Sequence, residues 1–306
     1  MKKLLVFTYI FAFQSILIAQ KSQKYVSFEE ALKHPENVEW LDLDCAETSY
    51  IQKKIAVLSN LKSLYITDCG LTKLPKEIRA LKKLNLLNIQ GNQVYTLPKS
   101  LSQLQNIKVI NLRNNAFKKL PETLTFLPKL REMDISYNPQ LDIENTISIL
   151  SKIEKLDFLY LNGNNLTIIP SDISKLKALE EIHLSNNPEL NISNAFTHLA
   201  QIQALKIVVL SNNNITVLPQ EVHLMQQING LVLDNNPFIQ IEELALKSSA
   251  LQNLKVLLLR NNNLSKFPSD ISGFNKLAVL ELSGNQFSKA EQERIKNQLP
   301  TTNVVF

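Results

Sequence analysis

Aliphatic residues recur along most of the chain in one fixed frame. Written from Leu84, the frame is L-x-x-L-x-L-x-x-N-x-L-x-x-L-P-x-x-I-x-x-L, and it returns at Ile107 and Leu156. The starts of the repeats fall at Val38, Leu61, Leu84, Ile107, Leu130, Leu156, Leu179, Leu205, Ile228, Leu254 and Leu277. The alternation in L-x-L is typical of a half-buried strand. Each repeat can bury its apolar side only against its neighbours, so the pattern predicts a stacked parallel sheet.

One polar position stays constant within the frame, directly after each predicted strand. It holds Asn92, Asn115, Asn138, Asn164, Asn187, Asn213, Asn236, Asn262 and Asn285. Cys69 and Ala46 take this place in the first two repeats. An amide at a strand end can satisfy backbone groups that a leucine would leave unpaired. We therefore expect a structural asparagine ladder rather than a set of ligand-binding residues.

The spacing of the repeats changes along the chain. The starts are 23 residues apart as far as Leu130, and then gaps of 26 and 23 alternate. The longer repeats replace Leu-Pro by Asn-Pro and extend their apolar row, as in Ile147, Leu150 and Ile153. Three extra residues are close to one helical turn. The long repeats are therefore predicted to carry helices on the convex side, and the short repeats tighter segments.

The two ends depart from the repeat pattern. Residues 1–19 have Lys2 and Lys3, an apolar run and a small residue at Ala19, which is the order of a secretory signal peptide. Residues 20–37, which contain the capping-box pair Ser27 and Glu30, are predicted to form an N-terminal cap. Residues 38–287 would form an array of about eleven repeats, and residues 288–306 a helical C-terminal cap. We expect an exported protein, with periplasm, cell surface and medium left open, and no membrane span in the mature chain.

These repeats resemble the leucine-rich-repeat superfamily, in particular the 23-residue L-P-x-x-I/L type found in bacterial, Ras-group and plant-defence-like arrays. The resemblance covers about residues 38–287. It implies an α/β solenoid shaped like a curved horseshoe, with a parallel sheet on the concave face and helical or 3-10 segments on the convex face. It also implies a module that binds a protein or peptide and does not catalyse a reaction.

Composition excludes several other functions. Removal of the two lysines in residues 1–19, which hold no acidic residue, lowers the net charge from +5 to +3, too little to indicate nucleic-acid binding. The four histidines are scattered, only six glycines occur, and no catalytic or phosphate-binding motif is present. Asp134 and His183 face outward two repeats apart, about 10 Å, too far for an acid–base pair. We expect no enzyme activity, no cofactor and no metal, and a monomeric protein.

The two cysteines carry a separate expectation. Cys45 and Cys69 lie in neighbouring repeats, but Cys69 occupies the inward asparagine place and Cys45 comes one position earlier in its repeat. Side chains one position apart along a strand point differently, and a disulfide needs Cβ atoms about 4 Å apart. The sequence therefore favours free or buried thiols over a bond, although an exported chain would permit the bond.

The outward strand positions are free to encode binding. In the first half they include Trp40, Tyr65, Arg113 and Asp134, and in the middle Phe158, Tyr160, Glu181 and His183. Later they become apolar, with Ile207, Val209, Val232, Val256 and Leu258. An exposed apolar patch indicates an interface. The alternative is that β-branched residues are simply favoured in strands, whether or not they bind a partner.

Three functional hypotheses follow. The leading one is a secreted or periplasmic protein that recognises a protein or peptide partner, of unknown identity, through its concave face. The second is a cell-surface adhesin or glycan binder, which would use aromatic residues such as Tyr65, Phe158 and Tyr160 to stack on sugars. The third is the recognition module of an enzyme system that the sequence does not reveal.

Overall fold

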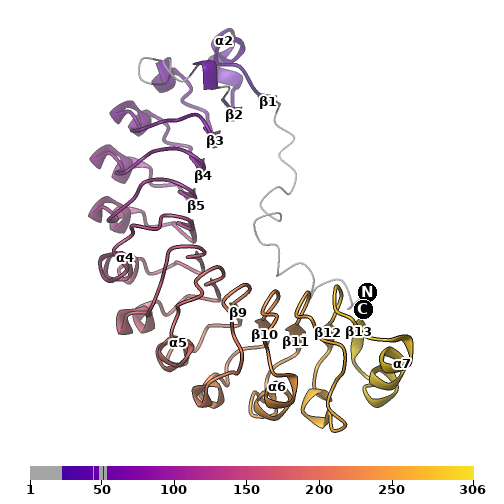
Figure 1. Cartoon of the computed structure of the whole chain (residues 1–306). Helices are drawn as coiled ribbons and strands as arrows, with labels where there is room; N and C mark the ends of the chain where they lie inside the picture. The colour runs from indigo at the N-terminus through magenta and orange to yellow at the C-terminus, as the bar shows by residue number, and fades with distance from the viewer. Residues whose placement is uncertain (1–22, 44, 48–50, 52–53) are drawn as a thin grey trace.

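The fold is known from a computed structural model, which describes residues 23–306 except 44, 48–50 and 52–53. In this part of the chain a sheet of thirteen strands, β1 to β13, follows the order of the sequence, and every neighbouring pair is parallel. Figure 1 shows the strands along the inner side of a curved arc and the helices α4 to α7 on its outer side. The predicted curved solenoid with a concave parallel sheet is therefore confirmed.

Each repeat contributes one short strand, β2 to β12, and the two ends add β1 and β13. The strands are β1 (Lys24–Tyr25), β2 (Trp40–Asp42), β3 (Ser63–Tyr65), β4 (Leu86–Asn88), β5 (Val109–Asn111), β6 (Glu132–Asp134), β7 (Phe158–Tyr160), β8 (Glu181–His183), β9 (Ile207–Val209), β10 (Gly230–Val232), β11 (Val256–Leu258), β12 (Val279–Glu281) and β13 (Asn303–Val305). In β2 to β12 the middle residue points into the core. Leu159 and Ile182 are examples, with no exposed surface.

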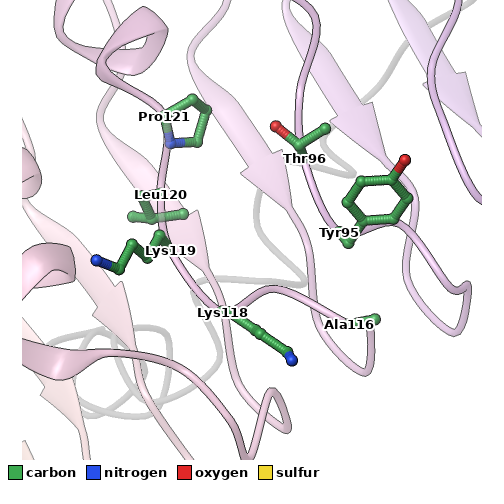
Figure 2. A pocket seen from close by; sticks show the side chains of 7 residues that line it. All are labelled: Tyr95, Thr96, Ala116, Lys118, Lys119, Leu120 and Pro121. Carbon is green, nitrogen blue, oxygen red and sulfur yellow. The ribbon is translucent and has the colours of Figure 1, made fainter.

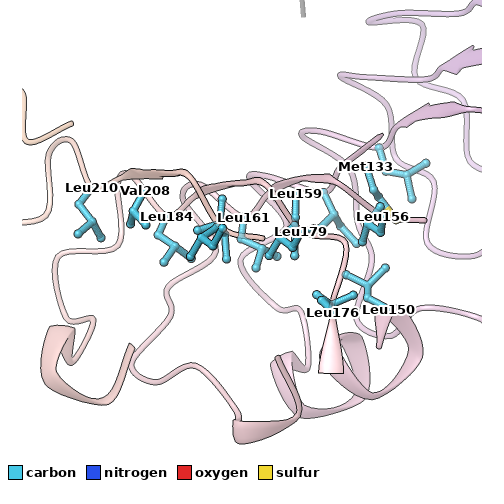
Figure 3. Close-up of a cluster of buried hydrophobic side chains, with 14 of the residues drawn as sticks. Met133, Leu150, Leu156, Leu159, Leu161, Leu176, Leu179, Leu184, Val208 and Leu210 are labelled. Atoms are coloured by element: carbon cyan, nitrogen blue, oxygen red, sulfur yellow. The ribbon is translucent and has the colours of Figure 1, made fainter. Parts of the chain in front are cut away.

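The core is a continuous column of aliphatic side chains between the sheet and the convex segments. Figure 3 shows Leu159, Leu161 and Val208 beneath the sheet, facing Leu150 and Leu176 from the convex side. All of these residues are buried. The core is enclosed by the parallel sheet on one side and by the helical segments on the other. Stacked repeats require such a shared interior, because each repeat buries its apolar side only against its neighbours.

The convex side carries two kinds of segment, which alternate from α4 onward as the spacing predicts. Short repeats carry 3-10 turns: η3 (Ile55–Val57), η4 (Lys76–Ala80), η5 (Lys99–Gln103), η6 (Glu122–Phe126), η7 (Ser171–Lys175), η8 (Gln220–Leu224) and η9 (Ser272–Phe274). Long repeats carry the α-helices α4 (Ile143–Leu150), α5 (Ile192–Leu199) and α6 (Ile241–Ser248). The side chains of Asp142 and Asn191 cap the first two of these helices. The prediction that the three extra residues build true helices is confirmed.

The asparagines after the strands lie in the interior and join neighbouring repeats. The Nδ2 group of Asn187 donates to the carbonyls of Leu161 at 3.1 Å and Leu184 at 2.9 Å. Its Oδ1 atom accepts the backbone N–H of Asn164 at 3.0 Å. Asn138 and Asn236 make the same kind of contacts, and all three are fully buried. Each amide thus satisfies backbone groups of two repeats.

Both ends of the sheet are covered by further elements. At the N-terminus, α2 (Phe28–Ala31) is capped by Ser27, with η1 (Pro35–Asn37) after it, and β1 pairs with β2. At the C-terminus, α7 (Lys289–Gln298) precedes β13, which pairs with β12. Residues 1–19, where a signal peptide is expected, lie outside the described residues. In the part of the chain that is described, no helix is long and apolar enough to cross a membrane.

The expectation of free cysteine thiols is wrong. Cys45 and Cys69 form a disulfide, with Cα atoms 4.8 Å apart. The expectation assumed that strand alternation extends to Cys45. The chain instead leaves β2 and enters the 3-10 turn η2 (Cys45–Glu47), where successive side chains no longer alternate. The turn allows Cys45 to face Cys69 of the adjacent repeat.

Candidate functional site

The concave face presents two rows of outward side chains, one from the first and one from the third residue of each strand. In the first row, Glu132, Phe158 and Glu181 lie side by side on β6, β7 and β8. In the second row, Asp134, Tyr160 and His183 lie side by side on the same strands. The sequence predicted that Asp134, Phe158, Tyr160, Glu181 and His183 share a face. The register brings them together with Glu132 near the middle of the arc.

The outward side chains are far less exposed than the sequence suggested. Tyr160 is 7% exposed, Asp134 5%, and Glu132 and Glu181 2% each. Strands about 4.8 Å apart bring outward side chains into lateral contact, so residues that point away from the core still cover one another. Phe158 and His183 retain intermediate exposure and form the accessible part of this region.

The apolar half of the concave face is contiguous but not an exposed patch. Its members pack into a second hydrophobic cluster, in which each residue is 3% to 8% exposed: Ile207, Val209, Val232, Val256, Leu258 and Val279. The interpretation of these residues as an exposed surface is therefore corrected. Their branched side chains bury one another across the strands and stabilise the sheet from its concave side.

A polar cluster occupies the neighbouring strands β6 to β8. The Nε2 atom of His183 lies 2.6 Å from Oε1 of Glu181, two residues earlier on the same strand. The imidazole also packs on the ring of Tyr160, with centroids 4.3 Å apart. The Tyr160 hydroxyl hydrogen-bonds the carboxylate of Glu132. These contacts join three strands into one network.

The acid that pairs with His183 is Glu181, two residues earlier on the same strand, and not Asp134, which lies two strands away. Alternate residues on a strand share a face, so the E-x-H order of Glu181 and His183 was the available signal. Glu132 and Asp157 were also absent from the predicted site.

Burial and mutual repulsion raise the pKa values of the acids in this cluster. The pKa of Glu132 rises to about 7, first because the carboxyl is buried and then because of the charge on Asp134. Burial also raises the pKa of Asp134, against the hydrogen bonds from Ser136 and the nearby charge of Arg113. Burial and the charge on Glu132 raise the pKa of the Tyr160 hydroxyl. Buried acids with displaced pKa values are typical of functional sites.

Three carboxylates in this region each have one oxygen without a partner. Oε1 of Glu132, Oε2 of Glu181 and Oδ1 of Asp157 are buried and accept no hydrogen bond. Arg131 reaches only the other oxygen of Asp157, through its Nε atom at 2.7 Å. Buried polar groups are nearly always paired. These oxygens therefore mark a place where a bound molecule could supply the missing hydrogen-bond donors.

The other predicted site residues lie elsewhere on the face. Trp40 and Tyr65, on β2 and β3, form a tilted aromatic pair with centroids 6.1 Å apart. Arg113 follows β5 and lies over the ring of Tyr137, 4.2 Å from its centroid. Arg113 therefore borders the polar cluster, whereas the Trp40–Tyr65 pair lies three strands away.

A hollow lies on the flank of the solenoid rather than on the concave face. It has a volume of about 550 Å³ and is lined by Tyr95, Thr96, Ala116, Lys118, Lys119, Leu120 and Pro121. Figure 2 shows these residues on two successive loops between the strands and the convex segments. It brings together backbone loops, two lysines and one exposed tyrosine, but no acid–base pair.

In the part of the chain that the structure describes, no group of three His, Cys, Asp or Glu side chains is arranged to hold a metal ion. The acids of the polar cluster are instead arranged around aromatic rings.

Comparisons with known proteins agree with the repeat architecture. A family profile described as a leucine-rich repeat region matches residues 22–159, and a leucine-rich-repeat profile matches residues 155–176 and 253–274. No curated protein sequence matches the chain. The chain is thus built as a repeat solenoid, and it belongs to the leucine-rich-repeat proteins. Members of this family are generally non-catalytic binding modules, and the fold suggests protein–protein interaction.

Two solved structures with a similar fold are internalins from Listeria monocytogenes. The internalin inlF is 21% identical over 82% of this chain and 75% of its own, with a TM-score of 0.54. The internalin C2 protein is 24% identical over 67% of this chain and 83% of its own, with a TM-score of 0.52. At this level of identity the similarity shows the fold alone.

Proposed function

We propose that this leucine-rich-repeat protein is exported and binds a protein or peptide partner through its concave face at β6 to β8. The observation that carries the proposal is the set of buried carboxylate oxygens without partners on Glu132, Asp157 and Glu181. A chain that bound nothing there would be more stable with apolar residues in place of these three acids, such as those on β9 to β12. The half-buried Phe158 supplies an aromatic anchor of the kind that dominates binding energy at interfaces.

Export is supported by two independent features. The basic, apolar and small-residue order of residues 1–19 is that of a signal peptide. The disulfide between Cys45 and Cys69 belongs to an oxidising compartment. Fractionation followed by N-terminal sequencing tests this part. We expect a mature protein that begins at Gln20, outside the cytoplasm, and a cytoplasmic protein with Met1 would contradict it.

The proposed domain organisation assigns binding to the array alone. Residues 20–37 and 288–306 cap its two ends, and residues 38–287 form about eleven repeats. We propose that the protein acts as a monomer and without catalysis. Sedimentation of the mature protein checks the oligomeric state, and a concentration-dependent dimer would contradict this part.

A matched pair of phenylalanines tests the concave-face proposal. Phe158 lies on the concave face with intermediate exposure, and Phe126 lies on the convex side with 64% exposure. Phe158→Ala should weaken partner capture from envelope and secretome fractions at least tenfold by quantitative mass spectrometry, the loss of about 1.4 kcal/mol or more expected for an anchor. Phe126→Ala should leave capture unchanged. Equal capture by both variants would reject the concave face as the binding surface.

The glycan-binding hypothesis has weaker support. Sugar stacking needs accessible ring faces, but Tyr160 is 7% exposed and its ring is covered by His183. Tyr65 packs against Trp40, three strands or more from Phe158. The aromatic residues therefore do not form one continuous platform.

A further inference from the structure

The most unusual feature of the concave face is a pair of buried glutamates on either side of an aromatic ring. Glu132, Phe158 and Glu181 are register partners on β6, β7 and β8. Each glutamate is 2% exposed, while Phe158 between them is half-buried. In the part of the chain that is described, neither glutamate forms an ion pair with a lysine or arginine, and Glu181 pairs with His183 instead. Two acids are thus buried together without a cation of the protein between them.

Each glutamate uses one oxygen, and its other oxygen is buried without a hydrogen-bond partner. Glu132 accepts the Tyr160 hydroxyl, and its Oε1 atom has no partner. Glu181 holds His183 through Oε1, and its Oε2 atom has no partner. Asp157, next to Phe158 in the sequence, leaves Oδ1 open as well. Hydrogen-bond acceptors without donors therefore border Phe158 on both sides.

We infer that this place holds the guanidinium group of an arginine side chain from the protein partner, stacked on Phe158 between Glu132 and Glu181. The inference rests on the proposed binding function and names the chemistry of the partner. A guanidinium is planar, packs on aromatic rings and presents five N–H donors along its edges, so one group can reach carboxylates on two sides. A lysine ammonium is a compact charge without a flat face, and it would satisfy the two glutamates less well.

The neighbouring strands indicate what surrounds the arginine in the partner. Ile207 follows Glu181 in the first row of the concave face, and Val209 follows His183 in the second row. Both belong to the apolar cluster of β9 to β12. A partner segment that places arginine over Phe158 would therefore lie next over this closely packed apolar cluster. An arginine flanked by aliphatic residues fits this sequence of surfaces.

Binding at this place should depend on pH. Glu132 has a pKa of about 7, because burial and the charge on Asp134 disfavour its ionised form. The charged or titratable groups that face it are Asp134 on β6, Asp157 and Tyr160 at β7, and Glu181 on β8. Arg113 after β5 and His183 on β8 act one step further out, on Asp134 and Glu181. A guanidinium favours ionised Glu132, so binding releases a proton. Affinity should rise about tenfold between pH 6 and pH 8, as the ionised fraction of a group with this pKa does.

The first experiment uses labelled peptides on the wild-type mature protein, measured by fluorescence anisotropy. The probe carries one arginine between valines, and matched probes carry lysine or citrulline at that position. Citrulline keeps the shape of arginine without its charge. The citrulline probe should bind at least tenfold more weakly at pH 8 than the arginine probe, and the lysine probe should fall between them. Equal affinity for arginine and citrulline, or for arginine and lysine, or no binding of any probe, overturns the inference.

The second experiment changes the two glutamates. Glu132→Gln and Glu181→Gln should each weaken binding of the arginine probe at least tenfold, and Glu132→Gln should also remove the rise in affinity with pH. Glu180→Gln is the matched control, because Glu180 is one residue from Glu181 but is more exposed and pairs with Lys206 at 3.0 Å. Thermal unfolding verifies that all three variants are folded. If the control loses as much affinity as the other two, the effect is general charge attraction and the inference is wrong.

The outcomes also separate this inference from the proposed function. Capture of the natural partner that depends on Phe158 but not on Glu132 or Glu181 would leave concave-face binding intact and overturn the arginine site. Capture that is indifferent to Phe158 would reject the proposed function, whatever the peptides show.

Discussion

Replacement of Glu132 by glutamine should make the protein more stable at neutral pH. The folded-state pKa of this carboxyl is about 7, compared with 4.5 for an unperturbed glutamate. At about 1.4 kcal/mol for each pKa unit, the ionised carboxyl destabilises the folded protein by about 3 kcal/mol above pH 7. Glutamine has the same shape, and its amide oxygen can still accept a hydrogen bond from the Tyr160 hydroxyl.

The sign of the pH dependence follows from the raised pKa. Below pH 4.5 the carboxyl is protonated in both the folded and the unfolded protein, so the penalty is absent. The penalty grows as the pH rises from 4.5 to 7, because only the unfolded protein then releases the proton freely. The stability of Glu132→Gln should therefore match that of the wild type at pH 4 and exceed it by about 3 kcal/mol at pH 8.

Urea denaturation of both proteins between pH 4 and pH 8.5 measures this difference. Glu180→Gln, at an exposed ion pair, should stay within about 0.5 kcal/mol of the wild type throughout. The Glu132→Gln variant could instead be less stable than the wild type at pH 8, or differ from it in unfolding free energy by the same amount at every pH. Either result would show that the buried acid has a structural role. Glu132 would then not be an acid that is kept for binding at the expense of stability.

Three further predictions concern the scaffold. Asn187→Ala should destabilise the protein by about 3 kcal/mol in urea denaturation, because it leaves buried backbone groups of two repeats unpaired; an unchanged midpoint would contradict this role. Thiol titration of the unfolded, unreduced protein should find no free thiol, and reduction of the Cys45–Cys69 bond should cost about 3 kcal/mol for a loop of this size; two reactive thiols would refute the disulfide. Gly163→Ala should destabilise by about 2 kcal/mol, since the residue has φ of +62° and a Cβ would lie 2.7 Å from the ring of Tyr137; part of the loss should disappear in a Tyr137→Asn background, and the same loss in both backgrounds would exclude the ring contact.

The repeat architecture was accessible from the sequence because it depends on local periodicity. Leucines at alternate positions predict which side of a strand is buried, and Leu159 and Ile182 are buried as expected. The alternation of 23 and 26 residues likewise predicted α4, α5 and α6, since a helix of two turns needs the added length. Both signals lie within one repeat, so no knowledge of distant contacts was required.

The candidate site was less accessible because it depends on contacts between repeats. Alternation says that Glu181 and Tyr160 point away from the core, but not that neighbouring strands bury them laterally. The Glu181–His183 pair was readable from their spacing, whereas the bond between Tyr160 and Glu132 runs between strands. The disulfide was missed for a related reason, because the 3-10 turn at Cys45 ends the alternation on which the expectation rested.

The central claim is that the concave face at β6 to β8 contacts the partner. The most direct test places a photo-cross-linking phenylalanine analogue at Phe158, and in a control protein at Phe126 on the convex side, 64% exposed. After irradiation in the presence of envelope and secretome proteins, the account predicts one dominant cross-linked partner from position 158, competed by unlabelled wild-type protein, and none from position 126. A partner that cross-links from position 126 and not from position 158 would contradict the account.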